Sequence, residues 1–384
     1  MYQKIMLCAG TRPEIIKMAP VYHALAAKGE TPLLLHTGQH EEMAWPLYDF
    51  FGMSPTQSLS PRRRGNSLAT LNASVLEQAG DAIEDARPVA VLVQGDTTSA
   101  QACALAAYYL NIPVGHVEAG LRTGQRDPFP EEKNRELIGR LAEWHFAPTP
   151  QAERNLAREG ITRHVHCVGN TAVDAVLLGS RRLSGWTPGN GAERSLLGFL
   201  EANPRKSLIL VTAHRRENWG EPILRVARAV RSLVEKRADV CVVWPLHANP
   251  ILRALVMPEL DALAATATHR LLATEPLNYP ALLFAMNRAG ILLTDSGGIQ
   301  EEAATLHKPV LVMRESTERQ ELIDAGGGLL VGTDQETIER EVIRLLDDDD
   351  AREAMEAAPN PFGDGRAAER IRDILNRGDA ACAG

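Results

Sequence analysis

The sequence predicts an α/β fold with two doubly wound, Rossmann-like domains. Short apolar runs alternate with amphipathic stretches along the whole chain, and the apolar runs are almost continuously hydrophobic. Such runs are typical of parallel strands that helices cover on both faces. A chain of 384 residues is long enough for two separate cores. The alternation breaks once, at the Gly-, Pro- and Ser-rich stretch 183–195, which we expect to separate the domains.

We expect each apolar run to form a strand and the stretches between them to form helices. The runs of the first half are KIMLCA (4–9), TPLLLH (31–36), VAVLVQG (89–95), IPVGHV (112–117), WHFAPT (144–149) and HVHCVG (164–169). Those of the second half are SLILVT (207–212), DVCVVWP (239–245), HRLLAT (269–274), AGILLTD (289–295) and KPVLVM (308–313).

The domain boundaries follow from this order. A final helix is predicted over 364–377, after the Pro- and Gly-rich stretch 358–365, and we expect it to return to the first domain. We therefore assign 1–170 plus 360–384 to the N-terminal domain and 171–359 to the C-terminal domain, with the hinge between about 171 and 205.

The charge balance limits the partners. Lys plus Arg number 41 and Asp plus Glu 49, so the net charge of −8 argues against a general binder of nucleic acids or of membrane surfaces. The apolar run at the N-terminus is too short for a signal peptide, and no later stretch approaches a transmembrane span. We therefore predict a cytoplasmic protein that binds anions only through local clusters of cations.

The cysteines predict neither a disulfide framework nor a zinc site. They are odd in number and scattered, and no CxxC pair occurs among Cys8, Cys103, Cys167, Cys241 and Cys382. The first four lie in apolar stretches, so we expect reduced, buried thiols and no bound metal.

Polar clusters follow directly after the expected strands. In doubly wound sheets, ligands bind at the carboxyl ends of the strands, and two such domains are expected to form a cleft there. In GTRPEIIK (10–17), Arg12 and Lys17 suit a diphosphate, because Arg can bind two oxygens and Lys adds a point charge. The alternative is solvated surface charge. Gly10 is not part of a GxGxxG, so nicotinamide dinucleotide binding has no support.

Three carboxylates near neighbouring strand ends are candidates for acid–base chemistry. Asp96 ends a strand before a helix start, where an Asp is also a common cap. Glu118 interrupts an apolar strand end, so it needs a partner or a shifted pKa; a structural ion pair is its alternative. Glu131 and Arg135 share one helix face, where a plain surface pair is the alternative.

The second half carries a basic turn and a glycine turn. His214 and Arg215, in TAHRREN (212–218), suit a catalytic or phosphate-facing role, and a simple basic turn is the alternative. For His247, a structural role and a functional role have equal support. TDSGGIQEE (294–302) has the form of a phosphate cradle at a helix start. Glu301 and Glu302 are expected in the first turn of that helix, where they would repel a phosphate.

Taken in order, these motifs closely resemble the non-hydrolysing UDP-N-acetylglucosamine 2-epimerase family. The resemblance runs essentially end to end, through GTRPEIIKMAP, GDTTS, GHVEAGLRTG, PFPEEKNR, VGNTAVDA, HRRENWG, LTDSGGIQEEA, KPVLVMRESTER, VGT and NPFGDGRA. It implies two Rossmann-like domains of the GT-B type, a cleft that closes on the substrate, and a homodimer.

The resemblance also implies a reaction. The family epimerises C2 of UDP-N-acetylglucosamine (UDP-GlcNAc) to give UDP-N-acetylmannosamine (UDP-ManNAc), by eliminating UDP to 2-acetamidoglucal and adding it back. Motif matching makes Asp96, Glu118 and Glu131 the acid–base set and places His214 near the diphosphate, without deciding which carboxylate removes the proton. Neither a metal nor another cofactor is implied.

The same matching implies the binding residues. Those expected to hold charge or sugar are Arg12, Lys17, Arg135, Arg215 and Arg319. Ser296, Gly297 and Gly298 are expected to bind the diphosphate. Glu302 is expected to accept hydrogen bonds from the ribose hydroxyls, which explains an acidic residue close to a phosphate site. Some members are activated by UDP-GlcNAc at a second site, which Gln39, His40, Arg215 and His247 match.

Other functions remain open at this level. A hydrolysing 2-epimerase would release ManNAc and UDP, and a relative could act on a 2,3-diacetamido uronic acid. A GT-B glycosyltransferase would need an acceptor groove but not the three carboxylates. A catalytically silent UDP-sugar sensor would not need the three carboxylates either.

Overall fold

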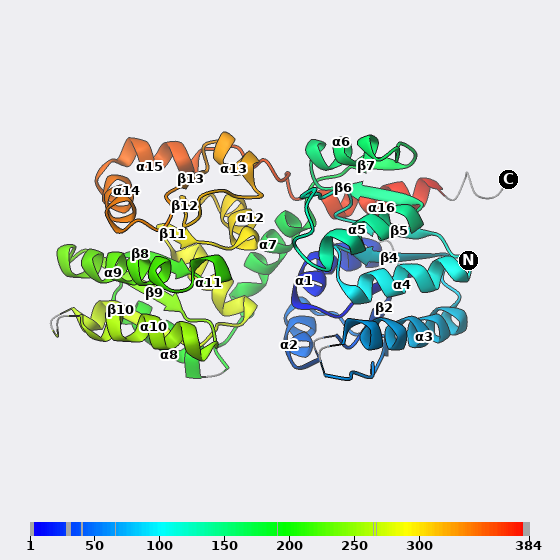
Figure 1. The fold of residues 1–384 in the computed structure, drawn as a ribbon, viewed down its shortest axis with the longest axis horizontal. Helices are drawn as coiled ribbons and strands as arrows, with labels where there is room; N and C mark the ends of the chain where they lie inside the picture. Colours follow the sequence, from blue (N-terminus) through cyan, green and yellow to red (C-terminus); the bar gives the residue numbers. More distant parts are fainter. Residues whose placement is uncertain are drawn as a thin grey trace. The chain divides into compact units, whose positions relative to one another are not determined.

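The structure is a computed structural model that describes residues 4–27, 32–39, 41–65, 67–189, 191–263, 265 and 267–378. The chain forms two compact units (Figure 1). The N-terminal unit comprises Met1–Leu178 and Phe362–Gly384, and the C-terminal unit comprises Gly179–Pro361. The change of unit falls inside helix α7 (Thr171–Arg182), before the Gly- and Pro-rich stretch. We propose these units as the domains of the chain.

The N-terminal unit is built on a parallel sheet of seven strands in the order β3-β2-β1-β4-β5-β6-β7. Its strands are β1 (Ile5–Ala9), β2 (Leu33–His36), β3 (Gln57–Ser58), β4 (Ala90–Gln94), β5 (Val114–Val117), β6 (Trp144–Ala147) and β7 (Val165–Cys167). Its helices are α1 (Arg12–Ala26), α2 (Glu41–Phe51), α3 (Leu68–Ala86), α4 (Thr98–Tyr109), α5 (Glu131–Leu141), α6 (Pro150–Arg158), most of α7, and α16 (Ala367–Gly378).

The C-terminal unit repeats this plan with six parallel strands in the order β10-β9-β8-β11-β12-β13. Its strands are β8 (Ser207–Thr212), β9 (Val240–Pro245), β10 (Leu271–Thr274), β11 (Ile291–Thr294), β12 (Val310–Val312) and β13 (Gly328–Leu330). Its α-helices are α8 (Gly191–Ala202), α9 (Glu221–Lys236), α10 (Pro250–Asp261), α11 (Tyr279–Arg288), α12 (Gly297–Thr305), α13 (Gln320–Asp324), α14 (Gln335–Asp347) and α15 (Asp349–Glu356). Short 3₁₀ turns occupy Leu183–Gly185, Arg216–Asn218 and Thr268–Arg270.

Each sheet has the strand order 3-2-1-4-5-6 of a Rossmann fold, extended by one strand in the N-terminal unit. The order reverses between β1 and β4 in the N-terminal unit and between β8 and β11 in the C-terminal unit. Loops at such a reversal diverge to opposite faces of the sheet and leave a crevice at the carboxyl ends of the strands. These two points are where a ligand is expected.

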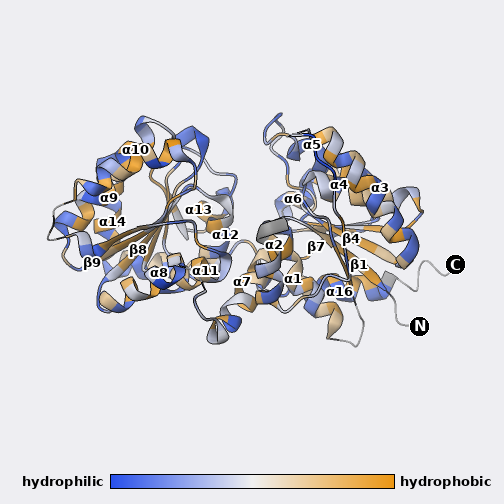
Figure 2. Cartoon of the chain, turned by 90° about the horizontal axis from the view of Figure 1, so that it is seen from below, coloured by the Kyte–Doolittle hydropathy of each residue, from blue (hydrophilic) through white to orange (hydrophobic). Residues whose placement is uncertain are grey.

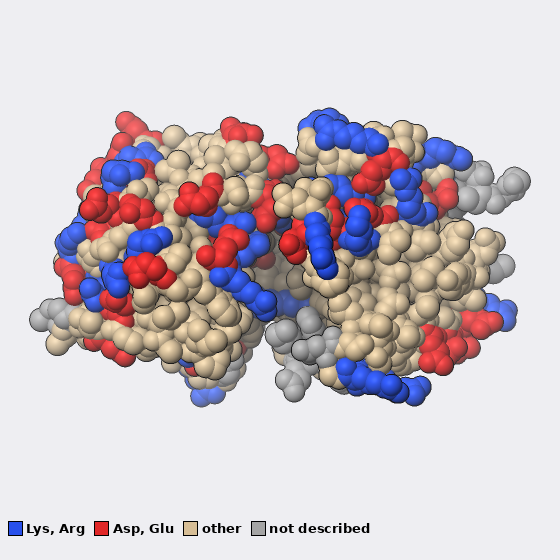
Figure 3. Space-filling model, viewed as in Figure 1, with Lys and Arg blue, Asp and Glu red and all other residues tan. Residues whose placement is uncertain are grey.

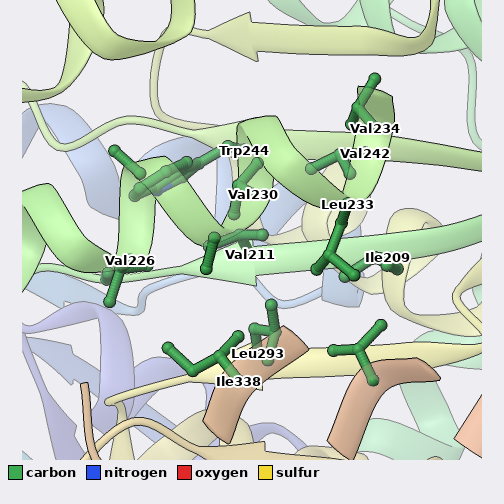
Figure 4. Close-up of a cluster of buried hydrophobic side chains, with 14 of the residues drawn as sticks. Ile209, Val211, Val226, Val230, Leu233, Val234, Val242, Trp244, Leu293 and Ile338 are labelled. Carbon is green, nitrogen blue, oxygen red and sulfur yellow. The ribbon is translucent and has the colours of Figure 1, made fainter. Parts of the chain in front are cut away.

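Each apolar run that predicted a strand contains a strand. Helices cover both faces of each sheet (Figure 2), and a strand that is buried on both faces must be apolar almost throughout. The core of the C-terminal unit packs α9 and α14 against its sheet, with Trp244, Val211 and Leu233 at its centre (Figure 4). The sequence did not predict β3 and β13. Both are very short and lie at the outer edges of their sheets.

One cysteine contradicts its prediction. Cys8, Cys103 and Cys241 are buried as expected, whereas Cys167 is exposed. It ends the edge strand β7, whose outer side no further strand covers. Cys382 lies outside the described residues. Within the described part of the chain, no helix combines the length and the apolar character that a membrane crossing requires.

The returning C-terminal segment is attached to the N-terminal unit by Asp174 of α7. Its two carboxylate oxygens accept the backbone N–H groups of Ala367, at 3.3 Å, and Ala368, at 2.9 Å. These N–H groups begin α16 and have no partner within that helix. Asp174 is buried, and burial raises the pKa of its carboxyl group to about 6.

Replacing Asp174 by Asn should change how stability depends on pH. Because the pKa in the folded protein lies above the ordinary 3.8, the folded state binds the proton more tightly than the unfolded state. The wild type should therefore gain stability relative to Asp174→Asn as the pH falls from about 7 to about 4, by up to about 3 kcal/mol. Urea denaturation at several pH values measures this difference.

Asp364→Asn is the matched control, because Arg370 lowers the pKa of Asp364. Its contribution is present at neutral pH and lost as the pH falls, so the control should show the opposite slope. Equal slopes for both variants would contradict the assignment to Asp174.

Candidate active site

The switch point of the N-terminal unit brings two candidate loops together. The loop after β1 carries Arg12 at the start of α1, and the loop after β4 carries Asp96. Glu14 joins these loops: its carboxylate accepts the N–H groups of Gly10 and Thr11, both at 2.8 Å, and the hydroxyl of Thr97, which caps α4. Burial raises the pKa of Glu14, an effect that these hydrogen bonds oppose. Glu14 was not among the predicted site residues, although Thr11-x-x-Glu14 is a capping box that can be recognised in the sequence.

Glu118 follows β5 and adopts a left-handed backbone conformation with φ of 69°. This conformation is uncommon for a residue with a side chain, and such strain is found preferentially at functional sites. One carboxylate oxygen of Glu118 accepts Lys17 and the other accepts the side-chain amide of Gln94. The partner that the sequence required for Glu118 is therefore Lys17 of α1.

Asp96 lies among charged groups from the two helices α1 and α5. Burial raises the pKa of its carboxyl group, Arg135 of α5 opposes this through an ion pair, and the nearby charge of Glu131 raises the pKa further. Lys17 also contributes, in the lowering direction. The structure thus gathers Asp96, Glu131, Lys17 and Arg135, and Lys17 connects this group to Glu118.

Helix α5 fixes this arrangement with a residue that the sequence analysis missed. The buried carboxylate of Glu132 accepts the N–H groups of Thr123 and Gly124, each at 3.0 Å. It also lies 3.3 Å from Arg135. The alternative of a surface pair between Glu131 and Arg135 is not observed. Arg135 instead pairs with Asp96 and Glu132, since α5 turns it toward the end of β4. The side chain of Asn134 supports this loop by donating to the Asp96 carbonyl at 2.8 Å.

The switch point of the C-terminal unit carries His214 after β8 and Asp295 after β11. Asp295 is fully buried and accepts the backbone N–H groups of His214 and Arg215, at 3.0 and 2.9 Å, and the side-chain amide of Asn218 at 3.0 Å. Its other oxygen lies 3.4 Å from Nδ1 of His214. Asp295 was not among the predicted site residues, although it directly follows an apolar strand just as Glu118 does.

The imidazole of His214 stacks on that of His247, with ring centroids 6.2 Å apart and an angle of 12° between the planes. Although part of the side chain reaches solvent, the surrounding protein lowers the pKa of His214 by desolvation, and Asp295 acts in the raising direction. Arg215 and His247 lower this pKa further. Arg215 itself lies 3.6 Å from Glu318.

The glycine turn begins helix α12, with Ser296 at its N-cap and Gly297 as its first residue. A Cβ atom at Gly297 would lie 3.1 Å from the guanidinium carbon of Arg319, so glycine allows this cation to approach the helix start. Around Gly298 the space is open. The N–H groups of the first turn and Arg319 thus favour an anion.

The two acidic residues of this helix differ from their prediction. Because α12 starts at Gly297, its first turn ends at Gln300, and Glu301 and Glu302 lie in the second turn. Glu301 is buried and accepts two guanidinium N–H groups of Arg319, at 2.9 and 2.7 Å, so its charge is balanced. Glu302 is half-buried on the same helix. The expected repulsion of a phosphate is therefore absent at Glu301, which positions the cation instead.

The residues expected at a second site divide between the units. The side-chain oxygen of Gln39 accepts the N–H and hydroxyl groups of Ser99 in the N-terminal unit, at 3.2 and 2.7 Å. Arg215 and His247 belong to the C-terminal unit. His40 lies outside the described residues. Among the described residues, no group of His, Cys, Asp and Glu side chains forms a metal site.

Two Rossmann-like units, one with a cluster of carboxylates and cations at its switch point and the other with a glycine turn beside Arg319, are the architecture of an α/β enzyme. The model of the family described as UDP-N-acetylglucosamine 2-epimerase matches residues 23–376. The chain belongs to this family, whose activity is that of an isomerase.

Individual relatives agree with this assignment. The UDP-N-acetylglucosamine 2-epimerase of Yersinia pestis is 43% identical over 379 residues, which cover 97% of this chain and 98% of the relative. The Escherichia coli K12 protein of the same name is 41% identical over 381 residues, with coverage of 97% and 98%. The solved structure of the Neisseria meningitidis UDP-GlcNAc 2-epimerase, bound to UDP-GlcNAc, is 37% identical, with a TM-score of 0.84 and coverage of 97% and 100%. This similarity confirms the predicted GT-B fold class.

Proposed function

We propose that this enzyme interconverts UDP-GlcNAc and UDP-ManNAc without net hydrolysis. The observation that carries the proposal is the cluster of Asp96, Glu118 and Glu131 with Lys17 and Arg135 at the switch point of the N-terminal unit. The N. meningitidis relative was solved with UDP-GlcNAc, which supports this substrate.

The chemistry explains why several carboxylates are needed. The C2 hydrogen of the sugar is not acidic, so direct deprotonation is unfavourable. Elimination of UDP gives 2-acetamidoglucal; protonation at C2 from the other face and re-addition of UDP then give the epimer. This sequence needs a base on one side of the sugar and an acid on the other. Glu118, held as an acceptor by Lys17 and Gln94, suits the base, and Asp96, whose pKa burial raises, suits the acid.

The C-terminal unit supplies the binding of UDP in this proposal. The helix start at Ser296, Gly297 and Gly298 would meet the diphosphate, together with Arg319 and His214. Charge that develops on the departing UDP is stabilised by such fixed donors. Arg12 and Arg215 are further cations at the switch points of their own units, available to phosphate or sugar.

Glu302 should select a ribonucleotide. A carboxylate is a good acceptor for two neighbouring hydroxyl groups, and hydrogen bonds to a charged group contribute about 1.5 to 3 kcal/mol. Glu302→Ala should therefore weaken UDP binding by about 10-fold or more and 2′-deoxy-UDP binding less, as measured by calorimetry. Exposed Glu353 of α15 provides the control variant Glu353→Ala, which should bind both nucleotides as the wild type does. Equal losses for the two nucleotides in Glu302→Ala would refute the assignment.

One experiment separates this function from its alternatives. The protein is incubated with UDP-GlcNAc in deuterated water and followed by proton NMR. We expect UDP-ManNAc in equilibrium with the substrate and deuterium at C2 of both sugars. Free ManNAc and UDP would instead indicate the hydrolysing reaction, and transfer only to an added acceptor would indicate a glycosyltransferase. Absence of all these reactions would contradict an enzyme acting on UDP-GlcNAc.

We also propose a cytoplasmic homodimer. Helix α4 contains no charged residue and ends in the exposed Tyr108 and Tyr109, 57% and 69% exposed. Exposed Leu137 lies on the neighbouring helix α5. Figure 3 shows a broad face over α4 that is free of Lys, Arg, Asp and Glu. Such an apolar surface suits a contact between identical chains. Light scattering should give twice the chain mass, and a monomer at working concentration would contradict this.

Activation by a second UDP-GlcNAc molecule belongs to the same proposal, with Gln39, Arg215 and His247 as its candidate residues. It predicts sigmoidal initial rates for UDP-GlcNAc and a dependence of the reverse reaction on added UDP-GlcNAc. Hyperbolic rates in both directions would contradict it.

A further inference from the structure

The carboxylate of Asp295 has more donors around it than a helix cap or a turn requires. One oxygen, Oδ2, accepts the N–H groups of His214 and Arg215 and the amide of Asn218. The other oxygen, Oδ1, accepts the His214 N–H at 3.2 Å and lies 3.4 Å from the ring nitrogen Nδ1. Oδ1 is therefore the oxygen directed at the imidazole.

Hydrogen bonds connect the backbone around Asp295 to the neighbouring strands. Its own N–H donates to the Thr212 carbonyl of β8, which extends the sheet by one residue at the switch point. Asn218 also donates to the Met313 carbonyl at 3.2 Å, so the loop that carries His214 is tied both to Asp295 and to the end of β12. The carboxylate thus holds a fixed position relative to the ring.

We propose that Asp295 is a positioning residue for His214. Its Oδ1 holds the proton on Nδ1 of the neutral ring, and its charge supports the ring when Nε2 also takes up a proton and donates it in a hydrogen bond to an anion. A histidine whose one nitrogen is occupied by a buried acceptor presents the other in a defined tautomer. The role at the diphosphate rests on the proposed function, whereas the arrangement of the ring does not.

The charged and titratable groups around the ring come from four loops. Asp295 follows β11, His247 follows β9, Arg215 lies beside His214 after β8, and Glu318 approaches Arg215 from the loop after β12. Arg215 and His247 disfavour the protonated ring, and Asp295 favours it. Removing the Asp295 charge should therefore make the ring harder to protonate.

The test is an NMR titration of the protein with ¹⁵N-labelled histidine, comparing wild type with Asp295→Asn. We expect His214 to titrate at a lower pH in the variant, and its neutral ring to change from the Nδ1-protonated form to a mixture. Epimerisation should fall by on the order of 10²-fold in kcat/KM at neutral pH, with the optimum moved to lower pH. An unchanged titration and tautomer in Asp295→Asn would overturn the proposal.

Asn218→Ala is the matched control, because it removes another donor to Asp295, whereas the backbone N–H groups of His214 and Arg215 still hold the carboxylate beside the ring. It should leave the titration and tautomer of His214 as in the wild type; an equal shift would make Asp295 only a loop anchor and overturn the proposal. If Asp295→Asn does not fold, the wild type alone decides, since a neutral ring protonated on Nε2 contradicts the arrangement. A protein that titrates as expected but does not epimerise would refute the proposed function and not the role of Asp295 toward the ring.

Discussion

Glu118→Gln should reduce kcat for the epimerisation of UDP-GlcNAc by about 10³-fold, because a neutral amide cannot accept the C2 proton. UDP binding should stay nearly unchanged, since Glu118 belongs to the N-terminal unit, whereas the glycine turn, Arg319 and His214, which are proposed to hold the diphosphate, belong to the C-terminal unit. Exchange of the C2 hydrogen with deuterated water should be lost together with turnover. Initial rates, NMR exchange and calorimetry with UDP provide the measurements.

Glu136→Gln is the matched control for this variant. Glu136 lies on α5 of the same unit and pairs at the surface with Lys133, at 2.6 Å. An exposed pair of this kind contributes little, so its loss should leave both kcat and exchange as in the wild type. Full activity of Glu118→Gln would overturn the role of Glu118 as the base.

Gly120→Ala should destabilise the N-terminal unit by about 3 kcal/mol. Gly120 has φ of 88°, and a Cβ atom there would lie 2.2 Å from the carbonyl oxygen of Ala152 on α6. The variant therefore combines an unfavourable backbone conformation, about 1 to 2 kcal/mol, with displacement of α6, about 1 to 3 kcal/mol. Chemical denaturation monitored by circular dichroism measures the loss.

Gly124→Ala separates these two terms. Gly124 lies in the same loop with φ of 70°, and a Cβ atom there would meet nothing within 4 Å. Only the backbone term remains, so this variant should lose about 1 to 2 kcal/mol. Equal losses in the two variants would show that α6 moves without cost, contrary to the expectation for Gly120.

The sequence was sufficient for the architecture because a doubly wound sheet needs strands that are apolar on both faces. The edge strand β3 lacks this signal, since Gln57 and Ser58 are exposed, whereas β13 is apolar but only three residues long. Likewise, the start of α12 at Gly297 moved Glu301 out of the first turn. The exact start of a helix is set by its cap and its neighbours, which apolar periodicity does not define.

Residues that organise the site were harder to predict than residues that face a ligand. The oxygens of Glu14 accept a hydroxyl from Thr97, and Asp295 accepts N–H groups from the loop after β8. These partners are 83, 81 and 80 residues away in sequence, so only the folded chain brings them together. For Arg135 the sequence offered Glu131 on its own helix face, whereas in the folded chain Arg135 pairs with the half-buried carboxylate of Asp96 at the end of β4.

The chain leaves the N-terminal unit within α7 and re-enters it at Phe362, with Asp174 accepting the first N–H groups of α16. During synthesis on the ribosome, all residues of the C-terminal unit therefore emerge before the last helix of the N-terminal unit does. The C-terminal unit can complete its core while the earlier unit still exposes the surface of α1 that α16 covers. Translation thus finishes the two units in the reverse of the order in which it begins them.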